Sequence, residues 1–134
     1  MTDRLAPEQR SYCMSCIRGR DTRIELQVAS LLHRRGLRFR KHVSGLPGRP
    51  DIVFSRARVA VFIDGDFWHG YHFPAWREKV SAFWQKKIAD TRDRDKRNFR
   101  KLRRMGWAVI RLWQHQVKDQ PGRCVARIVA AVGG

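Results

Sequence analysis

The sequence has little that would place it in or across a membrane. It contains no apolar run near the ~20 residues that span a bilayer, and its first ten residues, MTDRLAPEQR, lack the apolar stretch of a secretory signal. We therefore expect a cytoplasmic protein with no membrane association.

Cysteine is also scarce. Cys13 and Cys16 form an isolated C-x-x-C pair without a second pair to complete four zinc ligands, which favours incidental thiols in a reducing compartment over a zinc knuckle.

Acidic residues are few compared with basic ones. The chain has 12 Asp and Glu against 29 Lys and Arg, a formal charge of +17, and such self-repulsion is tolerated mainly where a polyanion neutralises it. Nucleic acid is the leading partner, with an anionic membrane surface or a purely solubilising charge as alternatives. Hydrophobic residues still make up 43% of the 134 residues, which is typical of a folded chain. We expect a single domain over residues 1–134, with residues 1–21 as an N-terminal arm.

Hydrophobic periodicity predicts an α/β order of elements. Thr22 and Glu25 fit a capping box for a helix that ends before Gly36, and two short runs rich in branched residues predict a strand hairpin. Residues 90–100 are nearly bare of apolar side chains, which leaves room for a break in the longest predicted helix. The order predicts a mixed sheet covered by helices. The predicted elements are a helix over 22–35, an edge strand over 37–42, strands over 51–54 and 59–63, a loop over 64–76, a helix over 77–105, a strand over 107–113 and a short helix after Pro121.

Two aspartates frame the predicted hairpin. Asp51 follows Pro50 at the start of the first strand and Asp64 ends the second, so both carboxylates can meet at one end of the sheet. Two hard oxygen ligands close together suit Mg²⁺, with water, phosphate and a backbone carbonyl such as that of Ile63 completing its octahedron. Asp-Gly is also a common turn pair, so a plain turn former is the alternative for Asp64.

A histidine lies on the loop that follows the hairpin. His69 is five residues beyond Asp64, and its pKa range suits a general base towards water or a general acid for the leaving oxygen. The alternative is a hydrogen-bonding surface histidine. Two further acids are equally open: Asp95 either orients His69 or pairs with its basic neighbours, and the capping box alone explains Glu25.

Aromatic and basic residues surround these acids. Phe67, Trp68 and Trp84 either stack on bases or fill a core. Between residues 86 and 104 there are ten basic residues against three aspartates. This net excess favours phosphate contact over a merely solvated helix face.

Five blocks of the sequence resemble the very short patch repair (Vsr) family of DNA mismatch endonucleases. The blocks are RSYCMSCIRGRDTRIE, LPGRPDIVF, VFIDGDFWHG, FWQKKIADTRDRD and GWAVIRLW, in that order, over about residues 10–115. The resemblance implies a restriction-endonuclease-like fold related to PD-(D/E)XK enzymes. It also implies a metal-dependent endonuclease that nicks one strand of duplex DNA beside a thymine-guanine mismatch left by deamination of 5-methylcytosine. A restriction-like or structure-selective nuclease on this fold and a non-catalytic DNA-binding module remain the alternatives.

The resemblance assigns catalytic roles to several residues. Asp51 matches the family's metal-binding aspartate and His69 its catalytic histidine, while Glu25 and Asp95 match acids that support the site. One position departs from the pattern, because the best-known members carry histidine where this chain has Asp64. A second carboxylate there brings the site closer to the restriction-enzyme pattern, and we expect Asp51 and Asp64 to hold one or two Mg²⁺ ions.

The resemblance also assigns DNA contacts. Phe67, Trp68 and Trp84 match aromatics that intercalate beside the mismatch from the major groove, and Met14 matches a residue of an arm that enters from the minor-groove side. Wedge insertion selects mismatches because a mismatched step is easier to unstack. We expect a monomer that binds double-stranded DNA, with mismatch-repair proteins as possible partners.

A second departure concerns a structural zinc site of Cys and His ligands in the best-known members. This chain lacks the cysteines of that site, so we expect the structural zinc to be absent, with packing of Tyr71, Phe73 and Trp76 stabilising the loop. A substitute metal site made of Asp66, His72 and His115 is a weaker alternative, since it contains no thiolate. The four zinc-ligand positions are occupied here by Asp66, Tyr71, Phe73 and His115.

Overall fold

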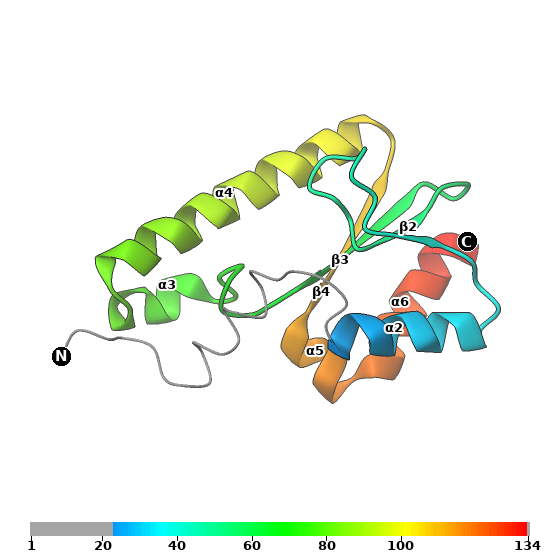
Figure 1. Ribbon diagram of the computed structural model, residues 1–134, viewed down its shortest axis with the longest axis horizontal. Coiled ribbons are helices and arrows are strands. Elements are labelled where there is room, and N and C mark those ends of the chain that lie inside the picture. Colours follow the sequence, from blue (N-terminus) through cyan, green and yellow to red (C-terminus); the bar gives the residue numbers. More distant parts are fainter. Residues whose placement is uncertain (1–22, 134) are drawn as a thin grey trace.

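The computed structural model describes residues 23–133 as a mixed four-stranded sheet between helices (Figure 1). None of the helices in this part of the chain is both long and apolar enough to cross a membrane. The whole of the predicted N-terminal arm, residues 1–21, lies outside the described residues, and with it Met14 and the C-x-x-C pair. In chain order the elements are α2 (Arg23–Arg34), β1 (Arg40–Lys41), β2 (Ile52–Phe54), β3 (Val59–Asp64), α3 (Phe73–Trp76), the 3₁₀ turn η1 (Arg77–Lys79), α4 (Ala82–Arg104), β4 (Ala108–Trp113), α5 (Gln114–Asp119) and α6 (Pro121–Gly133).

The sheet has the order β1-β2-β3-β4. The first two pairings are antiparallel, and β3 pairs with β4 in parallel over six residues, from Val59 opposite Ala108 to Asp64 opposite Trp113. A parallel pair needs a long crossover, which is the segment containing α4. The predicted α/β fold with a mixed sheet covered by helices is therefore confirmed.

Alternation along the strands sends side chains to two different cores. Val61 and Ile63 of β3 pack with α2, α5 and α6 on one face, whereas Phe62 packs on α4 on the other. In β4, Ile110 and Leu112 likewise face the first core. The same period of two places Asp64 and Arg111 on the face that α4 covers, where the functional site is built.

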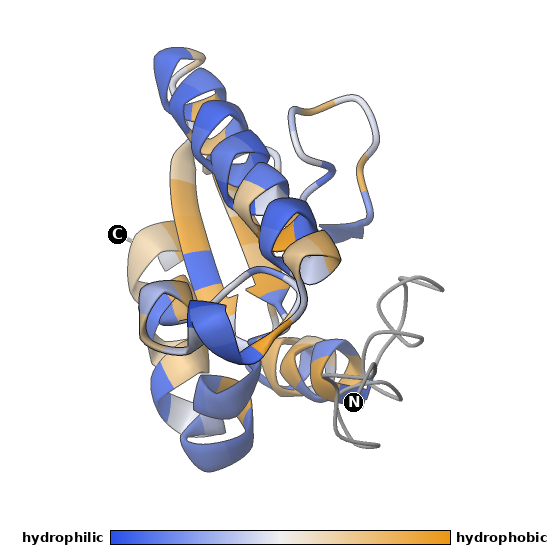
Figure 2. Cartoon of the chain, turned by 90° about the vertical axis from the view of Figure 1, so that its left-hand side faces the viewer, coloured by the Kyte–Doolittle hydropathy of each residue, from blue (hydrophilic) through white to orange (hydrophobic). Residues whose placement is uncertain are grey.

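Helix α4 runs without a break from Ala82 to Arg104. The hydroxyl of Ser81 accepts from the Trp84 N–H at its start. The predicted weak point at residues 90–100 does not break the helix, because Thr91 and Asp95 take up buried positions between Ile88 and Phe99. Most residues along the helix are hydrophilic, with a few hydrophobic ones between them (Figure 2). Of the hydrophobic ones, Phe99 and Leu102 pack against the sheet.

Several element boundaries differ from the sequence-based prediction. The edge strand predicted over 37–42 shortens to Arg40–Lys41. The segment predicted as a loop over 64–76 contains the short helix α3, and the six-residue helix α5, which has few apolar residues, was not anticipated. Both short helices lack the repeated apolar spacing by which longer helices are recognised.

Candidate active site

Asp51 lies at the point where the chain enters β2. Its backbone N–H donates to the carbonyl of Val61, which extends the β2–β3 ladder by one residue. Its side chain also bonds to β3, because Oδ2 accepts a 2.7 Å hydrogen bond from the backbone N–H of Ile63. The carboxylate is thereby held against β3 by the sheet itself.

Glu25 and His42 join Asp51 in the first of two groups. Glu25, buried at the start of α2, lies 3.3 Å from His42 Nε2, and donor atoms of all three residues lie within 4.8 Å of one another. The backbone of His42 is left-handed, with φ of 49°, and its N–H donates to the Asp51 carbonyl. His42 was not singled out from the sequence, since a histidine in a basic stretch just after a short strand carries no distinguishing pattern.

The electrostatics of this group fit a divalent cation. Burial and the charge of Glu25 raise the pKa of the Asp51 carboxyl to about 9, although the hydrogen bond from Ile63 lowers it. Two carboxylates that repel one another in a buried site are stabilised in ionised form by a shared cation. The donor set of two carboxylates and one imidazole is one that divalent metal ions accept.

Asp64, His69 and Asp95 form the second group. His69 Nδ1 lies 2.7 Å from Asp95 Oδ2, and His69 Nε2 lies 3.5 Å from Asp64 Oδ1. Burial by itself lowers the pKa of His69, but the negative charges of the two aspartates outweigh it, so the pKa is raised above its usual value. Asp95 thus contacts the histidine directly, as expected for the first of the two roles considered for it from the sequence.

Arg111 of β4 bridges the two aspartates of this group. Its Nε donates to Asp64 Oδ2 and its Nη2 to Asp95 Oδ2, each at 2.8 Å, and its guanidinium lies 4.1 Å from the centre of the Trp113 ring. Burial raises the pKa of Asp64 more than the charges of His69 and Arg111 lower it. The sequence analysis missed Arg111. An arginine on the helix-covered side of a strand was the available signal, because a buried cation requires acidic partners.

The expected partnership of Asp51 with Asp64 is therefore only electrostatic. The charge of Asp64 raises the pKa of Asp51, yet the two carboxylates belong to different groups, and Asp64 is engaged by Arg111 and His69. Ile63 contacts Asp51 through its N–H. The metal-ligand roles of Asp51, Asp64 and the Ile63 carbonyl remain predictions.

The loop that carries His69 is fixed at both sides. Gly70 has φ of 73°, and a Cβ at this position would lie 2.8 Å from side-chain atoms of Ile88 and Arg92, so the loop backbone presses directly on α4. On the other side, Asp66 Oδ1 lies 2.9 Å from His115 Nδ1 of α5.

These contacts occupy the region where the family resemblance puts zinc ligands. The ring of Tyr71 packs 4.4 Å from that of His115, and Phe73 is buried in the aromatic cluster below the loop. His72 is exposed, and its ring meets the ring of Tyr71. One carboxylate and one imidazole already bonded to each other do not make a structural zinc site.

The aromatic residues near the site differ in exposure. Phe67 is buried and packs on Trp76 and Trp84, while Trp68 and Trp84 are half-buried and meet edge to face. Phe83, which the sequence analysis assigned to no site, is 62% exposed at the start of α4 and contacts the Trp84 ring. Phe83 is therefore the most exposed of these aromatic side chains, and it contacts Trp84, one of the predicted DNA-binding residues.

Comparison with known proteins gives consistent matches. A family model described as DNA mismatch endonuclease Vsr matches residues 2–75. The type II nicking enzyme V.XorIIP of Xanthomonas oryzae pv. oryzae is 45% identical over 89% of this chain and 89% of its own length. The type II nicking enzyme V.NmeDIP of Neisseria meningitidis is 37% identical over 97% and 90%. The DNA mismatch endonuclease Vsr of Escherichia coli K12 is 42% identical over 78% and 69%.

The mixed sheet, the paired acidic groups and these relatives define a DNA endonuclease of the restriction-endonuclease-like fold. The chain belongs to the family of Vsr DNA mismatch endonucleases. The resemblance drawn from the five sequence blocks is thereby confirmed, and DNA is the substrate.

Proposed function

We propose that this chain is a Mg²⁺-dependent endonuclease that nicks one strand of duplex DNA beside a thymine-guanine mismatch. The observation that carries the proposal is the adjacency of the two groups: the backbone of Ile63 binds Asp51, and the next residue, Asp64, belongs to the group of His69. A donor set for a divalent ion thus lies beside a histidine with an acid at each ring nitrogen. The family supports DNA cleavage, and the name of the E. coli relative supports a mismatch as target.

Each group has a separate task in this proposal. Asp51 and Glu25, with His42 beside them, hold the ion. When bound, a divalent ion lowers the pKa of attacking water and stabilises charge on the transferring phosphoryl group. Asp64 already accepts a hydrogen bond from Arg111. It can therefore bind the metal through this oxygen only if that hydrogen bond breaks.

His69 handles the proton. Asp95 fixes the ring through Nδ1, so Nε2 is the nitrogen that faces the reacting atoms. Because the two aspartates raise its pKa, His69 carries a proton over a wider pH range than an isolated histidine, and this suits a general acid for the leaving oxygen.

Recognition of the mismatch would come from the aromatic residues at the start of α4 and on the adjoining loop. Trp68 and Trp84 are half-buried and pack edge to face on each other, and the exposed Phe83 contacts Trp84. Side chains of this kind insert at base steps that unstack easily, and a mismatched step is one of these. Met14 stays a predicted contact from the arm.

A nicking assay tests the proposal. One duplex sequence is prepared matched, with a T:G pair, and with other mismatches, and is incubated with protein in Mg²⁺ or in EDTA. We expect one strand of the T:G duplex to be nicked, only with Mg²⁺, while the matched duplex survives. Equal cutting of the matched duplex would favour a restriction-like nuclease, and binding without cleavage in any divalent ion a non-catalytic module.

Two variants make this assay specific to the site. Asp51→Ala is expected to abolish nicking while DNA binding stays measurable, since it removes a metal ligand. Asp119→Ala removes an exposed acid of α5 and is expected to nick as the wild type does. Equal nicking by Asp51→Ala and Asp119→Ala in Mg²⁺ rules the assignment out.

A further inference from the structure

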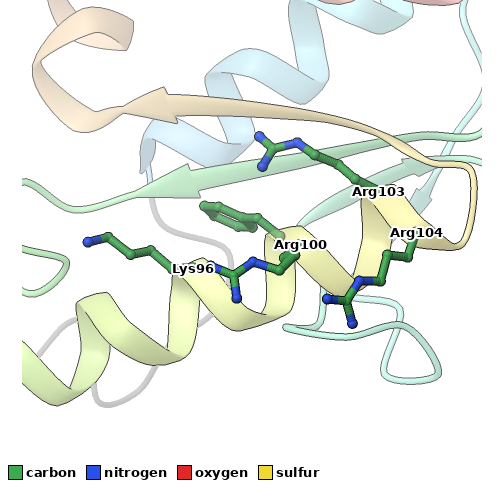
Figure 3. Close-up of a pocket in the computed structure, with 5 residues that line it drawn as sticks. Lys96, Arg100, Arg103 and Arg104 are labelled. Carbon is green, nitrogen blue, oxygen red and sulfur yellow. The ribbon is translucent and has the colours of Figure 1, made fainter.

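The C-terminal half of α4 carries a cationic groove. Figure 3 shows the four basic side chains that line it, and Phe99 is the fifth lining residue. The groove encloses about 450 Å³, and no acidic residue lines it. We call this feature the α4 groove, and its basic residues are Lys96, Arg100, Arg103 and Arg104.

The basic residues of the α4 groove have no acidic partner in the described part of the chain. Among residues 23–133, none of the four makes an ion pair, although Lys86 on the same helix pairs with Asp90 four residues away. Lys96, Arg100 and Arg104 follow one another at intervals of four, a spacing at which like charges destabilise a helix. The repulsion between these charges lowers the stability of the free protein, and a bound polyanion would reduce it.

The α4 groove adjoins the active site. Asp95, which orients His69, immediately precedes Lys96 in α4. The Phe99 ring lies 5.1 Å from the Arg111 guanidinium, which in turn binds Asp95. From Asp95 to Arg104 the helix rises about 14 Å, equal to the rise of about four nucleotides of one strand. A DNA strand held at His69 would therefore reach the groove within a few nucleotides.

We propose that the α4 groove binds backbone phosphates of the duplex on one side of the nick, within about four nucleotides of it. This inference rests on the proposed function for the location of the nick. A row of guanidinium groups suits successive phosphates, because each can make paired hydrogen bonds to phosphate oxygens. The contacts are independent of base identity and so position the strand without selecting its sequence.

The salt dependence of DNA binding tests the groove. Binding to a T:G duplex is measured in EDTA at several salt concentrations for the wild type, for Arg100→Ala/Arg104→Ala and for Arg34→Ala/Arg123→Ala. The second pair removes the same charge from exposed positions of α2 and α6, which cover the opposite face of the sheet. We expect the slope of log affinity against log salt to fall by about 2 for the groove variant, at about 0.9 per lost phosphate contact, and clearly less for the control. Equal slopes for the two variants overturn the proposal.

Shortened duplexes test the location. We expect the affinity gap between wild type and Arg100→Ala/Arg104→Ala to disappear when the duplex is cut back to about two base pairs on one side of the mismatch, and to persist when the other side is shortened. A gap that persists with both duplexes would show a diffuse charge effect and overturn the proposal. Neither measurement needs cleavage. A failure to nick T:G DNA would contradict the proposed function, whereas phosphate binding by the α4 groove would still be tested by DNA binding alone.

Discussion

At the scale of single residues, the site depends on one arginine that bridges two buried aspartates beside one histidine. Asp64 and Asp95 carry like charges close together, and Arg111 offsets their repulsion through two 2.8 Å hydrogen bonds. The same guanidinium lowers the pKa of His69 against the upward effect of the aspartates. Arg111 thus positions the acids and limits how strongly His69 holds its proton.

Replacing Arg111 should change the pH dependence of nicking. In Arg111→Met the pKa of His69 rises because a nearby positive charge is lost, so the pH–rate profile should shift to higher pH and the rate fall by about 10–100-fold. Arg111→Lys keeps the charge and should show a smaller shift. Single-turnover nicking from pH 5.5 to 9 provides the measurement.

The double variant Arg111→Met/Asp64→Asn guards against misfolding, since it removes the buried charge together with its partner. A loss of rate in Arg111→Met with an unchanged profile would assign Arg111 a purely structural role.

At the scale of elements, the spacing of apolar residues predicted the longer helices and strands. The hairpin, the parallel strand after Gly106 and the long helix follow from spacings of two and of three to four. Spacing does not encode which side chains meet across elements. Asp51 was paired with Asp64 because they frame one hairpin, but the packing of α2 brings Glu25 to Asp51, and β4 brings Arg111 to Asp64.

Near the start of α4, an exposed and a buried aromatic residue allow a role in DNA binding to be distinguished from a role in stability. Phe83→Ala removes a 62% exposed ring and should leave the free energy of unfolding within about 0.5 kcal/mol of the wild type. It should weaken binding to a T:G duplex about 10-fold, because stacking on a base is worth about 1–3 kcal/mol. Phe67→Ala empties a buried site and should cost about 3–5 kcal/mol of stability.

Urea unfolding and binding titrations on both variants are the measurements. Unchanged T:G binding by Phe83→Ala would remove Phe83 from the recognition surface. A stability loss in Phe83→Ala comparable to that in Phe67→Ala would show that the ring is packed in solution.

At the scale of the whole molecule, the protein carries charge in two places where it disfavours the free fold. The formal charge of +17 includes the arginines of the α4 groove, which form no ion pair with other described residues, and buried acids gather where β2 and β3 meet α2 and α4. The proposed ligands have the opposite sign in each place, phosphate for the first and a divalent cation for the second. If they bind as proposed, the stability lost in the free protein is recovered on binding.

This reasoning predicts an unusual pH dependence of stability in the metal-free protein. The pKa values of Asp51, Asp64 and His69 are all raised in the folded state, so the folded protein binds more protons than the unfolded one. Stability from such groups is complete below the unfolded pKa and is lost as pH rises through the folded one. For Asp51 this window runs from about 4 to about 9. In EDTA, Tm should therefore fall between pH 6 and pH 9, where ordinary carboxyls no longer titrate.

Asp51→Asn isolates the contribution of the first group. The variant cannot ionise at this position, so its Tm should exceed that of the wild type increasingly from pH 6 to pH 9, by about 3–5 °C for each kcal/mol relieved. Mg²⁺ should raise the Tm of the wild type, most at high pH, and leave Asp51→Asn nearly unchanged, while Asp119→Asn should follow the wild type throughout. Parallel curves of Tm against pH for the wild type and Asp51→Asn would contradict this prediction. They would mean that Asp51 is ionised without metal and that its burial beside Glu25 does not lower stability.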